Sequence, residues 1–414
     1  MRNMRKILAA SSLLLLLCGA AWGDLVYTTS AADYSSGTVG AITGSAGART
    51  VTPAVVPNLK SDLILFSFTN GGAQRLLLDE HDYAANDRIW AYGPETWTAP
   101  IANESWSNTK NAHAFAVANG RLYAGAYDSA NVVAYSMDES KTVPGPYTST
   151  GHFYNFPAAT ANHEAHVEGL VPSGGGLWAL VNYSDSMGST YMDSKLVELS
   201  PTLDATGGEF ELTDVRNASG IVALGTGRFA IAYRGGMQKL GTKGGVFTLT
   251  VETGEVVEIA GGSSGVDVGA VESICSDGAG GLWIVGQEYK WSGDWDDTYI
   301  EPSTTLYRWD GTSVSKEHDI SGTAGSAYSV RRDEADGTVA VVAGDKILLR
   351  DASGNWETFG SSQLGGWPTS VAFFKASKGS EEEENGSGGG GCSAAGLGAL
   401  ALAFPLFLIR RKGR

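Results

Sequence analysis

The sequence predicts an all-β protein folded as a β-propeller, on three observations. Between residues 24 and 378, short β-prone runs alternate with clusters of Gly, Asn, Asp and Ser about every ten residues, and helical periodicity is weak. A four-strand unit recurs at intervals of about 50 residues. Strands that fit no complete unit remain at both ends of this region, so the two ends can complete one unit together.

Each unit has an apolar first strand, a turn containing Gly, an aromatic-apolar second strand, a third strand and a more polar fourth strand. The clearest unit, HAFAVANGRLYAGAYDSANVVAYSM followed by GHFYNF, covers residues 113–156. Five further units begin at Asp62, Glu168, Ser219, Val271 and Ala327. Four short strands cannot bury both faces of their sheet alone, so such units stack around an axis as propeller blades.

The remaining strands predict how the ring closes. SVAFF, residues 370–374, is a lone innermost strand, whereas DLVYTTS, GTVGAIT and ARTVT near the start of the body lack one. Joined, they form a blade from both termini, which removes exposed sheet edges. We therefore expect seven four-stranded blades, with six or eight as alternatives. A pair of β-sandwiches or a β-helix is the competing fold class.

The body resembles the broad family of bacterial secreted propellers with weak repeats. The sequence contains no series of WD dipeptides, no kelch pattern of paired glycines and no repeated quinoprotein tryptophan-docking motif. The resemblance therefore implies the fold alone, because propellers serve as enzymes, binding proteins and scaffolds alike.

The start of the chain predicts export. Residues 1–23 combine a basic start, an apolar core and a small-residue exit, which is the pattern of a secretory signal peptide cleaved before Asp24. Leu17 stands directly before Cys18, where a lipobox requires a small residue, so we expect ordinary cleavage rather than N-terminal lipidation.

Charge and cysteine content narrow the function classes. The chain has a net charge of −16, and so acidic a surface repels phosphate backbones, which argues against a nucleic-acid partner. Of three cysteines only Cys275 lies in the body, so no disulfide is expected there, and we expect Cys275 to be a small core residue. The sequence also lacks a phosphate-binding glycine loop and a CxxC motif.

The segment ANHEAHVEG carries the first candidate site. It lies just before a predicted innermost strand, and His113 takes the corresponding place one blade earlier. Zinc and other divalent metals accept mixed imidazole and carboxylate ligands, and such a metal can activate water. We therefore predict His113, His163, His166 and Glu168 as candidate metal ligands, with Glu272 as a further oxygen donor. The alternative is that these are polar loop residues that hydrogen-bond the neighbouring blade.

The insertion QEYKWSGDWDDTYIEP, residues 287–302, carries the second candidate site. Exposed aromatic rings stack on sugar faces or apolar side chains, and adjacent carboxylates accept hydroxyl or ammonium protons. The predicted ligand-binding residues are Tyr289, Trp291, Asp294, Trp295, Asp297 and Tyr299. Calcium bound by the carboxylates, or aromatic residues that only cap the propeller mouth, are the alternatives. The loop at residues 182–195 is expected to lengthen the same face on another blade.

The end of the chain predicts a linker and a sorting segment. Residues 379–391 are acidic and glycine-rich, which is typical of a disordered spacer. Residues 392–414 contain an apolar stretch with Pro405 that is short for a bilayer-spanning helix, followed by a basic tip.

The segment GGGGCSAAGLGALALAFPLFLIRRK, residues 388–412, resembles the C-terminal sorting domains named GlyGly-CTERM and, most closely, SYNERG-CTERM. This resemblance implies that a rhomboid-type intramembrane protease processes the tail during export to the cell surface and outer membrane. It makes Gly391, Cys392 and Ser393 the processing region and Cys392 a candidate lipid-bearing residue. A plain short C-terminal membrane anchor is the alternative.

Two functions fit these observations. The leading hypothesis is a surface-anchored binding module that takes a protein, glycan or small ligand at the mouth rimmed by residues 182–195 and 287–302. The alternative is a metal-assisted hydrolase or lyase with its site at the same mouth, using the predicted histidines and carboxylates.

Overall fold

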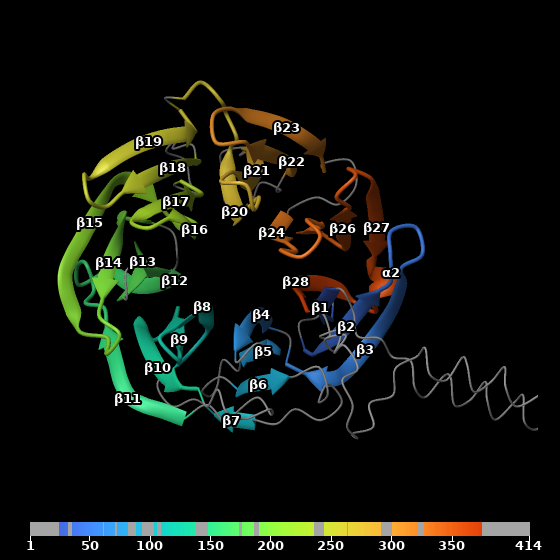
Figure 1. The fold of residues 1–414 in the computed structure, drawn as a ribbon, viewed down its shortest axis with the longest axis horizontal. Helices are drawn as coiled ribbons and strands as arrows, with labels where there is room; N and C mark the ends of the chain where they lie inside the picture. The colour runs from blue at the N-terminus through green and yellow to red at the C-terminus, as the bar shows by residue number, and fades with distance from the viewer. Residues whose placement is uncertain are drawn as a thin grey trace, which may run out of the picture. The chain divides into compact units, whose positions relative to one another are not determined.

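The computed structural model describes residues 25–374, apart from segments at 32–34, 61, 71–72, 82–87, 93–102, 106–108, 138–147, 174–175, 186–189, 236–243, 263, 291–299 and 321–326. In this part of the chain the strands form seven antiparallel four-stranded sheets arranged in a ring (Figure 1). The fold is therefore a seven-bladed β-propeller, as the sequence predicts, and the alternatives of six or eight blades, a β-sandwich pair or a β-helix are excluded.

Four strands from the axis outward make up each blade (Figure 1). The innermost strands are β28 (Trp367–Phe373), β4 (Asp62–Asn70), β8 (Ala112–Ala118), β12 (Glu164–Ser173), β16 (Ala218–Gly225), β20 (Ala270–Ser276) and β24 (Ala327–Arg332). The second strands are β1 (Leu25–Ser30), β5 (Ala73–His81), β9 (Arg121–Ala126), β13 (Gly176–Ser184), β17 (Arg228–Tyr233), β21 (Leu282–Lys290) and β25 (Val339–Ala343).

The outer half of each blade follows the same order. The third strands are β2 (Gly37–Thr43), β6 (Arg88–Tyr92), β10 (Asn131–Ser136), β14 (Asp193–Leu199), β18 (Gly245–Thr250), β22 (Ile300–Trp309) and β26 (Lys346–Arg350). The outermost strands are β3 (Thr50–Leu59), β7 (Asn103–Ser105), β11 (Thr148–Asn155), β15 (Ala205–Arg216), β19 (Glu255–Ala260), β23 (Val314–Asp319) and β27 (Trp356–Gly360). A single-turn helix, α2 (Ser361–Leu364), leads from β27 towards β28.

The blade formed by β28, β1, β2 and β3, here called the closing blade, joins both ends of the described chain. Leu25 at the start of β1 pairs with Phe373 near the end of β28, and Val26 pairs with Ala372. The prediction that strands from both termini share one blade is thus confirmed, and the pairing covers an edge that each terminus would otherwise expose.

Alternating side chains bury both faces of each sheet against neighbouring blades. In β13, Leu177, Ala179 and Val181 pack in a cluster with residues of the preceding blade. Trp178 and Leu180, which point to the opposite face, pack in another cluster with residues of the following blade. Because both faces are covered, the second strands are nearly continuous apolar runs rather than alternating ones. The core is therefore a set of layers between blades.

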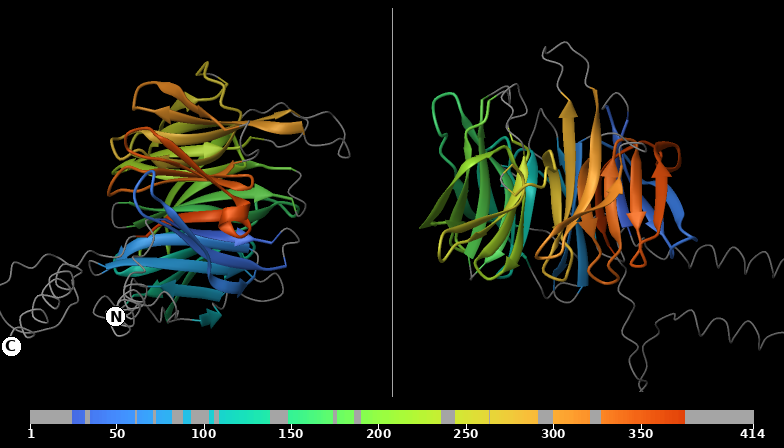
Figure 2. Two further views of the ribbon diagram at one scale, coloured as in Figure 1. Left: turned by 90° about the vertical axis from the view of Figure 1, so that its right-hand side faces the viewer. Right: turned by 90° about the horizontal axis from the view of Figure 1, so that it is seen from above.

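The strand order defines two faces of the ring. At the upper face the innermost strands begin and the second strands connect to the third, whereas at the lower face the first and second strands are joined. The β21–β22 ribbon is paired as far as Lys290 and Ile300 and rises above its neighbours (Figure 2). The two insertions, residues 182–195 and 287–302, therefore belong to the same face, as the sequence predicts.

Cys275 differs from the expected core residue in one respect. It lies on β20 and is only partly buried, although burial raises the pKa of its thiol to about 12. Such a thiol stays protonated at neutral pH and is a poor nucleophile.

The predicted linker at 379–391 and sorting segment at 392–414 lie outside the described residues. Within the described part, no helix has the length and apolar character needed to span a bilayer.

Candidate functional site

The innermost strands carry β-bulges at the upper face. At each bulge one residue of the innermost strand has no partner on the second strand, because the register shifts there. The unpaired residues are His113 in β8, Glu168 in β12, Ser219 in β16, Glu272 in β20, Tyr328 in β24 and Thr369 in β28, whereas β4 pairs with β5 without a shift. Bulges redirect a side chain out of the regular pleat and are frequent beside functional sites.

A second set of residues follows from the same register. Beside the bulges of β8, β12, β16 and β20, the residue that follows the second-strand partner of the bulge is also polar or aromatic. In four neighbouring blades these residues are Tyr127, Asn182, Arg234 and Gln287. The four bulge residues of the same blades, together with Tyr127 and Arg234, are only partly buried, whereas Asn182 and Gln287 are fully buried. We call these eight residues the upper cluster.

Asn182 ties two blades together beneath Glu168. Its side-chain amide donates to Glu168 Oε1 at 3.1 Å and to the Ala218 carbonyl oxygen of the next blade at 2.8 Å. Its Oδ1 accepts the Ala218 N–H at 2.8 Å and the Ser194 hydroxyl at 2.7 Å. Since all of its hydrogen-bonding groups are engaged, Asn182 holds the Glu168 carboxylate in a fixed place.

Arg234 makes the corresponding link one blade further on. Its Nε donates to Glu272 Oε2 at 2.8 Å, and one terminal nitrogen donates to Asn217 Oδ1 at 3.2 Å. The Ser219 hydroxyl, from the same blade as Arg234, donates to the Val271 carbonyl oxygen next to Glu272. The Glu272 side chain keeps only 12% of its surface exposed, so this ion pair is better shielded from water than a surface pair.

Tyr127 is the centre of an aromatic stack. The Tyr127 ring is nearly parallel to the His166 ring, with centroids 4.1 Å apart, and lies 4.9 Å from the His113 ring. Burial, with a smaller contribution from the Glu168 charge, raises the pKa of Tyr127, so its phenol stays protonated. Burial, with a smaller contribution from the Glu168 charge, also raises the pKa of Tyr191 from the β13–β14 loop.

His166 is held by both ring nitrogens. Its Nδ1 lies 3.0 Å from the Tyr127 carbonyl oxygen and must donate to it, because a carbonyl only accepts. In the neutral tautomer Nε2 then accepts the Ser184 hydroxyl at 2.9 Å. His163 has other partners, Thr160 at 2.9 Å and Thr190 at 3.2 Å.

The structure thus gathers part of the predicted metal set. His113 and His166 both lie against the Tyr127 ring, whereas both ring nitrogens of His163 are bonded to threonines. Among the described residues, no group of three or more His, Cys, Asp and Glu side chains is placed to hold a metal ion. Metal binding by His113, His163, His166 and Glu168 stays a prediction.

The predicted aromatic insertion lies outside the described residues. This applies to Trp291, Asp294, Trp295, Asp297 and Tyr299, and to the side chain of Tyr289, and also to Gly391, Cys392 and Ser393 of the predicted processing region. Their roles stay predictions.

Sequence reasoning missed Tyr127, Asn182, Arg234 and Trp367. The first three each follow the apolar run of a second strand, so a strict alignment of the units could have found them. Trp367, at the start of β28 on the upper face, is a large aromatic side chain that keeps 50% of its surface exposed.

No known protein family and no curated protein matches the sequence. Among solved structures, the periplasmic gluconolactonase PpgL of Pseudomonas aeruginosa is similar, with a TM-score of 0.56, 13% identity, and coverage of 85% of this chain and 99% of that one. A Bacteroides fragilis protein assigned as a 6-phosphogluconolactonase gives a TM-score of 0.55 at 10% identity, covering 85% of this chain and 98% of that one. At these identities the likeness shows the fold alone.

Proposed function

We propose that this chain is a binding protein that takes a hydroxyl-rich ligand, a glycan or a sugar-like small molecule, at the upper face. The upper cluster is the observation that supports it. Four neighbouring blades present a bulge residue at the same register position, and each of the four is polar and within reach of water. A purely structural repeat needs the same backbone in every blade but gains nothing from polar side chains at the mouth.

The chemistry of the cluster suits such a ligand. Glu168 and Glu272 accept hydrogen bonds from hydroxyl groups, and Arg234 donates to ring or hydroxyl oxygens. Asn182 and Arg234 fix the two carboxylates before a ligand arrives, which lowers the entropy cost of binding. Trp367 adds an exposed aromatic surface on the same face.

The proposal also includes the localisation of the protein. The signal-like residues 1–23 support export, and the resemblance of residues 388–412 to a sorting domain supports attachment to, or release from, the cell surface. Processing of the tail by a rhomboid-type protease is part of the same proposal. Cleavage is tested by mass spectrometry of the exported protein, since a tail retained to Arg414 would contradict it.

A glycan and sugar-acid binding screen, followed by calorimetry, tests the binding proposal. Glu272→Gln removes the charge at the upper cluster while keeping the shape of the side chain, and it should weaken binding about tenfold. Glu317→Gln is the matched control, because Glu317 also faces an arginine, Arg350 at 3.8 Å, but lies on the outermost strand β23. The proposal would be contradicted if both changes weakened binding equally, or if Glu272→Gln left ligand binding unchanged.

A metal-assisted hydrolase is the second candidate. Its support is the contact of His113 and His166 with one tyrosine beside Glu168, together with the gluconolactonase chemistry of the similar PpgL. Metal analysis of the purified protein and a lactone hydrolysis assay decide between the two. A stoichiometric metal and a lactonase activity, both lost in His113→Ala and His166→Ala, would establish the hydrolase and overturn the binding proposal.

A further inference from the structure

The innermost strands separate charges of opposite sign along the axis of the ring. The acidic residues on these seven strands all lie in the first half of their strand, towards the upper face: Asp62, Glu164, Glu168 and Glu272. The basic residues are Arg331 and Arg332, the last two residues of β24, which ends at the lower face. The innermost strands are therefore basic at their lower end alone, in a chain whose net charge is −16.

Arg331 lies where both water and protein surround it. The residue is exposed, and Ala223 near the lower end of the innermost strand β16 is exposed as well, so water reaches the axis here. The surrounding blades nevertheless desolvate the guanidinium, which lowers the pKa of Arg331. Both observations fit a side chain that projects into a water-filled space enclosed by the blades.

The Arg331 guanidinium has no carboxylate partner among the described residues. One terminal nitrogen donates to the Val330 carbonyl oxygen at 3.0 Å, and a guanidinium has four further N–H donors. Its ionisable neighbour is Cys275 of β20, whose thiol stays protonated and therefore uncharged because it is buried. A desolvated cation without a counter-charge is costly, so an anion from solution would stabilise it.

Arg332 adds a second guanidinium beside the same thiol. Burial raises the pKa of Cys275, and the charges of Arg331 and Arg332 act against this rise, so both lie near its sulfur atom. The Arg332 guanidinium lies over Gly278 in the β20–β21 turn, because a Cβ atom there would clash with it. In the part of the chain that the structure describes, Arg332 makes no ion pair and no side-chain hydrogen bond.

Two aspartates beside the arginines have other partners. Asp277, next to Gly278 in the chain, accepts a hydrogen bond from Arg308 at 3.1 Å. Asp333, which follows Arg332, accepts the Ala335 N–H at 2.9 Å and lines a cavity between the closing blade and the β24–β27 blade. Neither carboxylate therefore forms an ion pair with the two arginines.

We propose that the lower end of the axis binds an oxyanion, a phosphate or carboxylate group of a small molecule, held by Arg331 with Arg332 beside it. A planar guanidinium binds either group through two parallel N–H donors. The enclosed position strengthens the attraction, because less water screens it than at an open surface. The acidic residues at the upper end repel the same anion, so it enters from the lower face. This site is separate from the upper cluster and does not depend on the function proposed for it.

Calorimetry and thermal melting with inorganic phosphate and with glutarate, a five-carbon dicarboxylate, test the proposal. Sodium chloride at matched ionic strength is the control, since it screens charges but offers no paired oxygen acceptors. Arg331→Gln removes the charge, and Arg331→Lys keeps the charge but not the paired donors. Arg228→Gln is the matched control variant. Arg228 is another exposed arginine at the lower face with no ion pair to a described residue, but it begins the second strand β17, away from the axis.

We expect at least one of the two anions to bind and to raise the melting temperature, which sodium chloride does not reproduce. Arg331→Gln should weaken binding about tenfold, Arg331→Lys should weaken it less, and Arg228→Gln should leave it unchanged. Tighter binding of phosphate or of glutarate assigns the group that the site prefers. Binding of neither anion, an equal effect of sodium chloride, or an equal loss in Arg228→Gln would overturn the proposal. A melting curve of each variant without the anion shows that it is folded.

Discussion

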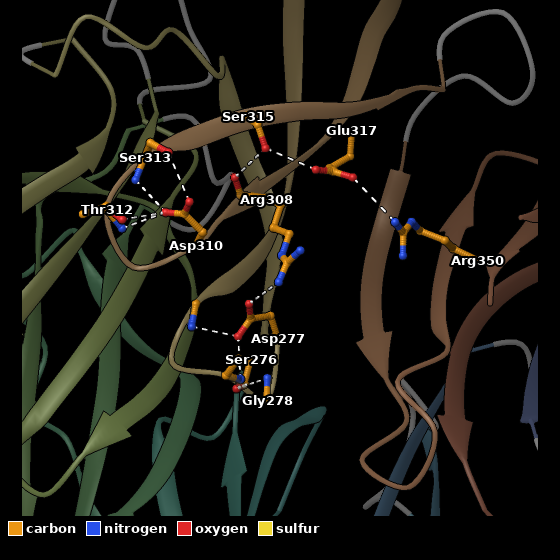
Figure 3. A network of polar contacts seen from close by, with 12 residues as sticks. Ser276, Asp277, Gly278, Arg308, Asp310, Thr312, Ser313, Ser315, Glu317 and Arg350 are labelled. Carbon is orange, nitrogen blue, oxygen red and sulfur yellow. Dashed lines mark hydrogen bonds and ion pairs between the residues drawn. The ribbon is translucent and has the colours of Figure 1, made fainter. Parts of the chain in front are cut away.

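Asp277 shows how one carboxylate holds a turn at the lower face. It follows β20 and accepts the N–H groups of Ala279 and Gly281, each at 2.8 Å, and a terminal nitrogen of Arg308 at 3.1 Å (Figure 3). The Arg308 guanidinium in turn lies 5.6 Å from the centre of the Trp283 ring. Asp277 therefore holds the β20–β21 turn and also positions the Arg308 guanidinium near the Trp283 ring.

Replacing Asp277 with Ala should destabilise the protein by about 1–3 kcal/mol at pH 7, because three donors lose their acceptor. Burial raises the pKa of this carboxyl, but the N–H groups of Ala279 and Gly281 and the Arg308 charge outweigh it, so the pKa is lowered on balance. The stabilisation is therefore complete above the ordinary aspartate pKa and is lost as pH falls through the folded-state pKa. Urea unfolding of both proteins across this pH range measures the difference.

Asp310→Ala provides the control for this prediction. Asp310 caps the β22–β23 turn in the same way, accepting the Ser313 and Thr312 N–H groups, but it is exposed (Figure 3). These N–H groups lower its pKa to about 2. A loss of stability as large as that of Asp277→Ala would show that burial and Arg308 contribute nothing.

At the residue scale, the sequence predicts the upper-face residues of the innermost strands better than those of the second strands. His113, His166, Glu168 and Glu272 could be chosen because each stands at the start of a predicted innermost strand. Tyr127 and Arg234 each follow the apolar run of a second strand, so their positions can be aligned, but their closeness to these residues depends on register shifts. A bulge adds one residue without changing the residue types around it, so the pattern of apolar and polar residues does not reveal it.

At the scale of the elements, the predicted units agree closely with the blades. The predicted starts at Asp62 and Ala327 are also the first residues of β4 and β24, and that at Ser219 differs by one residue from β16. The prediction at Glu168 is four residues late, because β12 begins at Glu164. Its first four residues alternate, because Ala165 and Val167 are buried in an interblade cluster whereas Glu164 and His166 are polar, and the two polar residues make the segment resemble a loop.

Gly40 on β2 shows how closely neighbouring strands approach in the closing blade. A Cβ atom at this position would lie 2.3 Å from the Tyr27 ring of β1, which is fully buried. The Tyr27 hydroxyl donates to the Leu364 carbonyl oxygen of α2 at 3.0 Å, so the ring has little freedom to move. The packing of α2, β1 and β2 therefore requires a residue without a side chain at position 40.

We expect Gly40→Ala to destabilise the protein by about 1–3 kcal/mol, because the methyl group overpacks the space that the Tyr27 ring fills. Thermal and urea unfolding measure this loss. Gly262→Ala is the control, because a Cβ atom there meets no atom within 4 Å. If both variants were equally stable, the Tyr27 ring would have to shift without cost.

At the scale of the whole molecule, the ring is closed by hydrogen bonds between strands from the two ends of the described chain (Figure 1). The side chains of β28 alternate between two interblade layers. Val371 and Phe373 pack in the layer shared with the β24–β27 blade, and Ala372 packs in the layer shared with the β4–β7 blade, together with Phe374. Loss of this one strand therefore opens two interfaces and uncovers the edge of β1.

A chain that ends at Gly366 should consequently lose cooperative folding. Full burial of each large apolar side chain contributes about 1.5–3 kcal/mol, and three such side chains with a row of sheet hydrogen bonds approach the whole stability of a typical domain, about 5–15 kcal/mol. A chain that ends at Ala376 keeps β28 and every other described strand, so it should melt like the full chain. Calorimetric melting of the two truncated proteins makes the comparison. Adding a peptide of residues 367–376 to the shorter chain should restore its transition by pairing with β1, and a shorter chain that melts unaided like the longer one would show that the interblade layers alone close the ring.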